Sequence, residues 1–74
     1  IDFYLPLEND IEISIYNIKG EKVRVLFSGY INSGYHNFIW DGKSDLNNNL
    51  PSGIYFINFY YDNKIASNKV IKIK

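Results

Sequence analysis

The chain has 74 residues, a length typical of one small domain, and its eight basic residues balance its eight acidic residues. A zero net charge argues against electrostatic binding of nucleic acid, which requires a basic face. The absence of cysteine excludes disulfides, thiol catalysis and Cys-ligated zinc, and no apolar run approaches the roughly 18 residues of a membrane-spanning helix.

The first half of the chain alternates apolar and polar side chains with the period of a β-strand. Strands are expected over residues 1–5, 11–16 and 22–27. Pro6 ends the first strand, because proline cannot donate to a ladder, and Gly20 is expected at positive φ in a hairpin loop. Val23 and Val25 face one way, yet Leu26 also resembles a core residue. This pattern predicts a bulge in the third strand.

The second half continues with strands after a connection containing two glycines. They are expected over residues 35–40, 53–61 and 64–74. The side chains expected to point into the core are His36, Phe38, Trp40, Tyr55, Ile57, Phe59, Ile71 and Ile73. Asp62 and Asn63 tolerate the left-handed region, which predicts a tight two-residue turn between the last two strands.

Short strands without a credible helix place the chain in the all-β class. We expect residues 1–74 to form a single small Ig-like or fibronectin-III-like antiparallel β-sandwich of about six to seven strands, although a small barrel also fits. The chain is 46% hydrophobic, which favours a well-filled core. Trp40 is the single tryptophan, and its large flat side chain suits the ~10 Å gap between two sheets.

Several motifs occur in a fixed order along the chain. They are Ile-x-Phe-x-Leu-Pro (1–6), Ile-x-Ile-Tyr-Asn-x-x-Gly-x-x-Val (13–23), Gly-Tyr-His-x-x-x-Trp-Asp-Gly (34–42), Pro-Ser-Gly-Ile-Tyr-Phe (51–56) and Asn-Lys-Val-Ile-Lys-Ile-Lys (68–74). This order resembles the Ig-like domain of the flagellar hook-capping protein and, more closely, the type A C-terminal sorting domains of the type IX secretion system. The residues that carry the central motifs are Trp40, Asp41, Gly42, Pro51, Gly53 and Tyr55.

The resemblance implies a non-catalytic sorting or anchoring module at the C-terminus of a bacterial protein that passes through the periplasm and is secreted or held at the cell surface. Its implied partners are secretion or assembly machinery and the rest of its parent chain. Because the sequence contains no methionine, we also expect the chain to be a piece of a longer protein. The candidate sorting strand comprises Lys69, Val70, Ile71, Lys72, Ile73 and Lys74. The alternative is a structural spacer or assembly module. Family members often begin with an Asn-Pro-Phe segment, which this chain lacks.

The polar loop after Trp40 contains side chains that could bind calcium. The candidate ligands are Asp41, Asp45, Asn47 and Asn49. Hard cations prefer such oxygens, but the loop lacks the glycine and the closing glutamate of an EF-hand. Asx turns are the preferred interpretation, and no metal or cofactor is expected. His36, the single histidine, is expected to pack and hydrogen-bond near Trp40, because zinc needs several ligands.

Exposed aromatic side chains suggest a third function, carbohydrate binding. Tyr35, Phe56 and Tyr60 are expected on the face opposite the core, where their rings could stack on sugars or form a docking patch. The alternative is that Phe56 lies beneath a neighbouring loop or beneath a segment upstream of residue 1. The carboxylates that come nearest to a pair, Asp10, Glu12 and Glu21, lie beside turns and on an outward strand face. Glycosidase chemistry needs two carboxyls flanking a cleft, so no enzymatic activity is expected.

Overall fold

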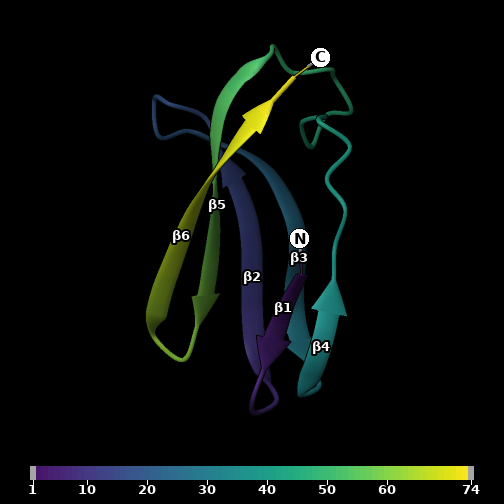
Figure 1. Cartoon of the computed structure of the whole chain (residues 1–74), viewed down its shortest axis with the longest axis vertical. Coiled ribbons are helices and arrows are strands. Elements are labelled where there is room, and N and C mark those ends of the chain that lie inside the picture. The colour runs from purple at the N-terminus through teal and green to yellow at the C-terminus, as the bar shows by residue number, and fades with distance from the viewer. Residues whose placement is uncertain (1, 74) are drawn as a thin grey trace.

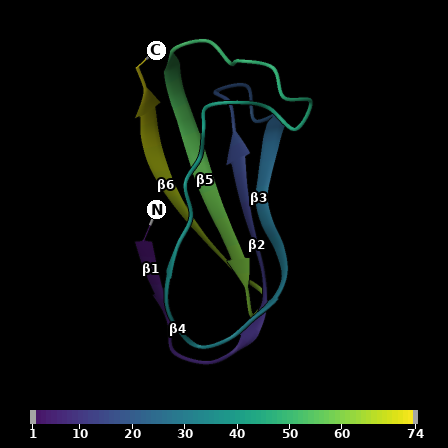
Figure 2. The same ribbon diagram turned by 90° about the vertical axis from the view of Figure 1, so that its right-hand side faces the viewer.

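The computed structural model describes residues 2–73, and every strand pairing in it is antiparallel (Figure 1). The strands are β1 (Asp2–Leu5), β2 (Asn9–Tyr16), β3 (Lys22–Ile31), β4 (Gly34–Asn37), β5 (Gly53–Tyr61) and β6 (Lys64–Lys72). β1 and β4 form one sheet, and the other sheet has the order β3-β2-β5-β6. The two sheets form a small sandwich (Figure 2), which confirms the predicted fold class. None of the described segments is a helix that could cross a membrane.

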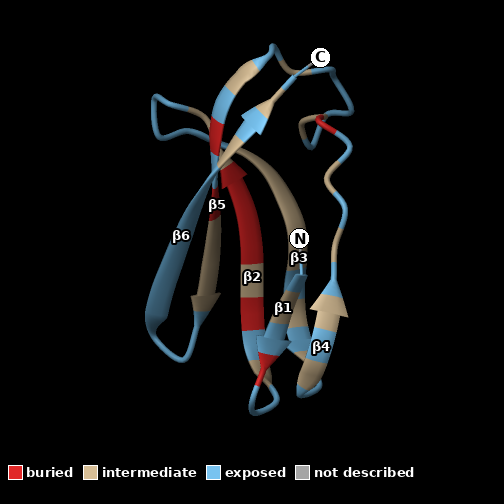
Figure 3. Cartoon of the chain, viewed as in Figure 1, coloured by how far each residue is buried: buried red, intermediate tan, exposed pale blue. Residues whose placement is uncertain are grey.

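The core lies along β2, the strand with the clearest alternation in the sequence. Ile11, Ile13 and Ile15 are buried on its inner face (Figure 3). The other buried hydrophobic residues among those described are Leu5, Tyr55 and Ile57. Full burial of one such aliphatic side chain contributes about 1.5–3 kcal/mol. β2 and its neighbour β5 therefore supply most of the fold's hydrophobic stabilisation.

The bulge expected in the third strand is present, and it changes which residues face the core. The register of β2 with β3 shifts twice, so that Leu26 and Val23 on β3 have no directly opposite residue on β2. An extra residue reverses the side of the sheet to which the following side chains point. Val23 and Leu26 therefore pack against the core. The prediction that Val25 shares the face of Val23 is wrong.

Several predicted strand ends differ from the structure. β2 begins at Asn9 and β4 at Gly34, slightly earlier than expected, and β6 ends at Lys72. β3 continues to Ile31, because its second half pairs with β2 from Asn9 onward. β4 ends at Asn37 instead of Trp40, and its described pairing with β1 ends at the Asp2–Asn37 pair. The alternation continues beyond the strand, with Phe38 half-buried and Ile39 exposed. Side-chain burial therefore follows the sequence pattern even where the ladder stops.

The β5–β6 hairpin begins as predicted, but the last strand faces the other way. β5 has the expected bounds, and Asp62 and Asn63 have φ values of 50° and 59°. Ile71 and Ile73 are 65% and 87% exposed, so the prediction that they point inward is wrong. Tyr55 is buried and pairs with Val70, so the inward side chains of β6 are Val70 and its alternate neighbours. Lys74 lies outside the described residues.

Candidate functional site

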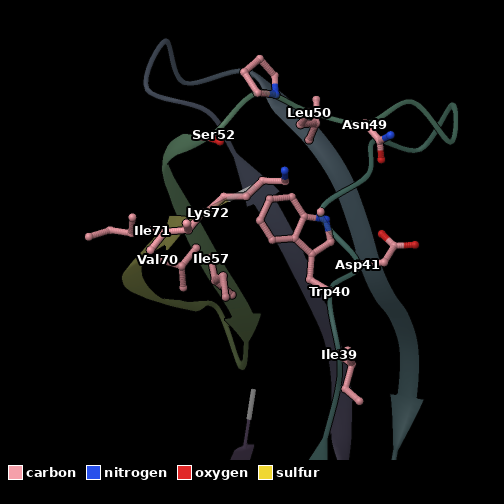
Figure 4. A pocket seen from close by; sticks show the side chains of 13 residues that line it. Ile39, Trp40, Asp41, Asn49, Leu50, Ser52, Ile57, Val70, Ile71 and Lys72 are labelled. Carbon is pink, nitrogen blue, oxygen red and sulfur yellow. The ribbon is translucent and has the colours of Figure 1, made fainter.

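The loop after β4 and the end of β6 border an open groove of about 940 Å³ (Figure 4). Its walls come from segments 39–42, 49–52 and 70–73, and Ile57 of β5 also lines it. The Trp-Asp-Gly motif, the Pro-Ser-Gly motif and the final strand are far apart in the sequence, yet they meet here. We define this hollow as the Trp40 groove.

An aromatic unit supports one wall of the Trp40 groove. The Trp40 indole packs edge-on against the Tyr55 ring at a centroid distance of 5.2 Å, and its Nε1 donates to the Lys43 carbonyl. The Tyr55 hydroxyl donates to the Pro51 carbonyl at 2.7 Å, as in the tyrosine corner of Ig domains. Trp40 was expected on a strand at mid-sandwich. It instead lies in a loop, half-buried, and covers Tyr55.

Gly42 lets the last strand contact the loop. Its backbone has φ +80°, and a Cβ built there would lie 2.5 Å from Cε of Lys72. The Lys72 side chain therefore occupies the space that any other residue at position 42 would fill. Figure 4 shows this side chain extending from β6 toward the Trp40 indole. The glycine thus has two reasons to be present, a left-handed backbone and a close approach.

Arg24 of β3 holds the carboxylates of the polar loop. Its guanidinium lies 3.5 Å from Oδ1 of Asp41 and 3.9 Å from Oδ1 of Asp45. It also donates to the carbonyls of Lys43 and Ser44. The two carboxylates in turn accept hydrogen bonds from backbone N–H groups, Asp41 from Lys43 and Asp45 from Val25 of β3. This arrangement anchors the loop to the sheet.

The same contacts argue against calcium binding in the loop. Asp41 and Asp45 already pair with the guanidinium of Arg24, and the hydrogen bond from the Lys43 N–H to Asp41 closes an Asx turn. Asn47 and Asn49 are exposed, and Asn47 adopts φ +66° within the turn. Within residues 2–73 there is no group of three histidine, cysteine or acidic side chains that could hold a metal ion.

A family comparison adds to this geometry. The sequence model of the FlgD Ig-like domain matches residues 1–64, which include five of the six strands in full and the Trp-Asp-Gly and Pro-Ser-Gly motifs. The chain belongs to the FlgD Ig-like domain family. Neither the curated proteins nor the solved structures yielded a match. The family is one of structural, non-catalytic domains.

The histidine of this FlgD Ig-like domain is packed, as expected, but not near Trp40. His36 Nε2 lies 2.6 Å from the carbonyl oxygen of Asn32, and its ring is 5.5 Å from that of Phe3. The expected partner was wrong because β4 pairs with β1, so that His36 lies directly opposite Phe3. His36 therefore belongs to the packing of the smaller sheet.

The three aromatic residues proposed for sugar stacking do not form one patch. Tyr35 is 86% exposed on β4, where its ring packs on Tyr4. Phe56 and Tyr60 lie on β5, in the other sheet. The Tyr60 hydroxyl is 2.7 Å from that of Tyr16, a hydrogen bond that lowers the pKa of Tyr60 and raises that of Tyr16. The rings are thus divided between two sheets, and the prediction of a common platform is wrong.

The outward carboxylate of β2 has a structural partner. Glu12 accepts hydrogen bonds from Lys22, at 2.8 Å, and from the buried Ser14 hydroxyl. The Lys22 bond, followed by the Ser14 bond, lowers the pKa of Glu12, and the same carboxylate raises the pKa of Lys22. A lowered pKa of the carboxylate and a raised pKa of the lysine are expected for an ion pair, and this one lies at the surface of the sheet.

Sequence reasoning missed Arg24 altogether and did not predict where the side chain of Lys72 lies. Nothing in the local pattern around Arg24 shows that its partners lie about twenty residues away. Lys72 was named in the candidate sorting strand with Ile71 and Ile73 inward, so its contact with Gly42 was not predicted, but the hairpin register could have placed it. A two-residue turn at positions 62–63 pairs Tyr61 with Lys64, and counting outward pairs Gly53 with Lys72.

Proposed function

We propose that this FlgD Ig-like domain is a non-catalytic assembly module of a secreted or cell-surface bacterial protein. The observation that carries the proposal is the family match across residues 1–64, since that family is structural. The module would connect or cap other parts of its parent chain or of a larger assembly. Its contribution would be a stable surface and not a reaction.

The chemistry of the Trp40 groove supports a role in protein contact. Trp40, Leu50 and Val70 supply apolar surface, and Lys72 adds a cation that forms no ion pair among the described residues. Asp41, the carboxylate of this groove, is engaged by Arg24. Aromatic surface edged by a charged group is typical of sites that bind protein segments.

The parent protein supplies the test. The domain is deleted from it in its own bacterium, and both export and assembly of the parent are measured. The assembly role predicts that the shortened parent still leaves the cell but no longer joins its complex or stays attached. A shortened parent that assembles normally would show that the proposal is wrong.

A second candidate is sorting by a type IX secretion system, because the order of the motifs resembles that of its type A C-terminal sorting domains. The exposure of the end of β6 favours it, because Lys69, Ile71 and Ile73 are accessible to a receptor. A reporter fused to the domain would lose surface export when residues 68–74 are removed. The full-length variants Lys69→Glu and Lys72→Glu are needed beside it, because the deletion also removes part of the hairpin. Export unchanged in all three would eliminate this candidate.

A further inference from the structure

β6 is an edge strand with a long unpaired side. It pairs with β5 alone over all of its nine residues, and no other described strand borders it. Residues 64–69 are all exposed. Such an edge presents a row of backbone groups that a further strand can bind.

The turn determines which backbone groups face outward. In a two-residue hairpin, the residues flanking the turn exchange both hydrogen bonds, and alternate residues beyond them do the same. Tyr61 and Lys64 flank the turn here, so every second residue from Lys64 bonds to β5. The intervening residues Ile65, Ser67, Lys69 and Ile71 direct their N–H and C=O groups to the free side. These four residues can therefore bind a strand without any loss to the existing sheet.

An apolar groove adjoins this free edge. It has a volume of about 430 Å³ and lies between β1 and the inner face of β5 and β6. Phe3, Leu5 and Phe59 line it together with Ala66 and Val70. Ala66 is on the core-facing side of β6 but is exposed, because the smaller sheet does not extend over it. Side chains of an added strand would enter this groove from its open side.

The charge of the edge determines which strand fits. β6 carries Lys64, Lys69 and Lys72 and no acidic residue. None of these lysines is in an ion pair among the described residues, although Lys22 and Arg24 both are. Like charges placed opposite each other destabilise a strand pair. A second copy of this cationic strand is therefore disfavoured, whereas a strand with carboxylates is attracted.

We propose that the free edge of β6 accepts an extended acidic segment of a partner protein as a fifth strand of the larger sheet. Its carboxylates pair with Lys64, Lys69 and Lys72, and its apolar side chains fill the groove beside Phe3. Main-chain bonds would supply affinity, and the alternating side chains would supply specificity, as in other strand additions. The inference rests on the proposed assembly function, for which it names the class of partner.

A fluorescent peptide as long as β6 provides the probe. The sequence Glu-Thr-Val-Glu-Val-Thr-Val-Thr-Glu, bound antiparallel, places glutamates opposite the three lysines and valines toward the groove. We expect saturable binding by fluorescence anisotropy that weakens as salt increases. The matched peptide with lysine in place of each glutamate should not bind. Failure of the acidic peptide to bind, or equal binding of both peptides, would overturn the inference.

Variants of the domain locate the binding site. Lys69→Glu and Lys72→Glu should each weaken peptide binding by at least about tenfold, whereas Lys19→Glu, in the exposed turn after β2, should not. Ile71→Pro removes an outward N–H without breaking a bond to β5 and should abolish binding. Thermal unfolding checks that the proline variant folds; if it does not, the charge variants and the salt series decide. Unchanged binding in both charge variants would contradict the proposal.

Two further outcomes separate this inference from the assembly function. A dimer in sedimentation experiments that Lys69→Glu alters would mean that the edge binds a second copy, contrary to the proposal. If the acidic peptide does not bind but the parent still requires the domain for assembly, the strand-addition inference is wrong and the assembly function stands. If the peptide binds but the domain is dispensable in the parent, the assembly function is wrong.

Discussion

Substitution of Gly42 by alanine tests the contact between the Trp-Asp-Gly loop and the last strand. At φ +80° a non-glycine residue costs about 1–2 kcal/mol from backbone strain. The new Cβ would also lie 2.5 Å from Lys72 Cε, so the lysine must leave its place. Exposing one or two of its methylene groups costs about 0.8 kcal/mol each. We therefore expect Gly42→Ala to lower the free energy of unfolding by about 2–3 kcal/mol.

Gly20 offers a matched control for this prediction. Its φ of +83° is nearly the same, but a Cβ there would have no atom within 4 Å. Gly20→Ala should therefore show only the strain, about 1–2 kcal/mol, in urea unfolding at neutral pH. In a Lys72→Ala background the cost of Gly42→Ala should fall to the Gly20→Ala value. Equal costs for the two glycines, or a cost that does not change when Lys72 is removed, would refute the reasoning.

Four further predictions rest on individual contacts. Tyr55→Phe removes the hydrogen bond to the Pro51 carbonyl and should lower the free energy of unfolding by about 1 kcal/mol in urea titration. Arg24→Met removes the cation that holds the polar loop, so amide hydrogen exchange in residues 43–48 should accelerate. In the wild-type domain Arg24 already pairs with the loop carboxylates, so millimolar calcium should leave the melting temperature unchanged. The Glu12–Lys22 pair should contribute about 0.2–1 kcal/mol, because both groups are partly exposed. Because the pKa of Glu12 is lowered, its contribution to the free energy of unfolding is present above about pH 4.5 and is lost as the pH falls through the folded-state pKa. Because the pKa of Lys22 is raised, its contribution is present below about pH 10.5 and is lost as the pH rises through the folded-state pKa.

Comparison variants in the same chain test three of these predictions: the Tyr55 hydrogen bond, the ion pair and the calcium result. Tyr61→Phe removes a hydroxyl for which no hydrogen bond is found in the described residues, so it should change stability little. Glu12→Gln should flatten the acid side of the stability profile; an unchanged profile would contradict the ion-pair interpretation. If calcium raised the melting temperature of the wild type but not that of Asp45→Asn, the loop would bind calcium despite the contacts of Arg24.

Local chemistry accounts for the parts of the fold that sequence reasoning predicted correctly. The alternation in residues 11–15 and 53–59 requires one buried face per strand, and both strands occupy the core. Gly20 and the Asp62-Asn63 pair have the positive φ values that their positions require. The bulge was foreseen from Leu26, which interrupts the alternation of its strand. Each of these features depends on residues close together in the chain.

The candidate site depends on contacts that local patterns do not contain. The partners of Arg24 are determined by where the polar loop meets β3, and the position of His36 by the pairing of β4 with β1. Tyr35 is separated from Phe56 because the two strands belong to different sheets. A period of two tells which residues share a face, but not which strand lies beside that face.

The sequence by itself determined that this chain forms an all-β fold of antiparallel strands, either a sandwich or a small barrel, because alternation and turn chemistry act within each strand and its adjacent turn. Only the tertiary structure showed that Gly42 admits Lys72, and that β6 keeps an open, cationic edge. Both facts depend on register and sheet order. These are set by the packing of the whole core, since a shift of one residue would turn every side chain of a strand to its other face.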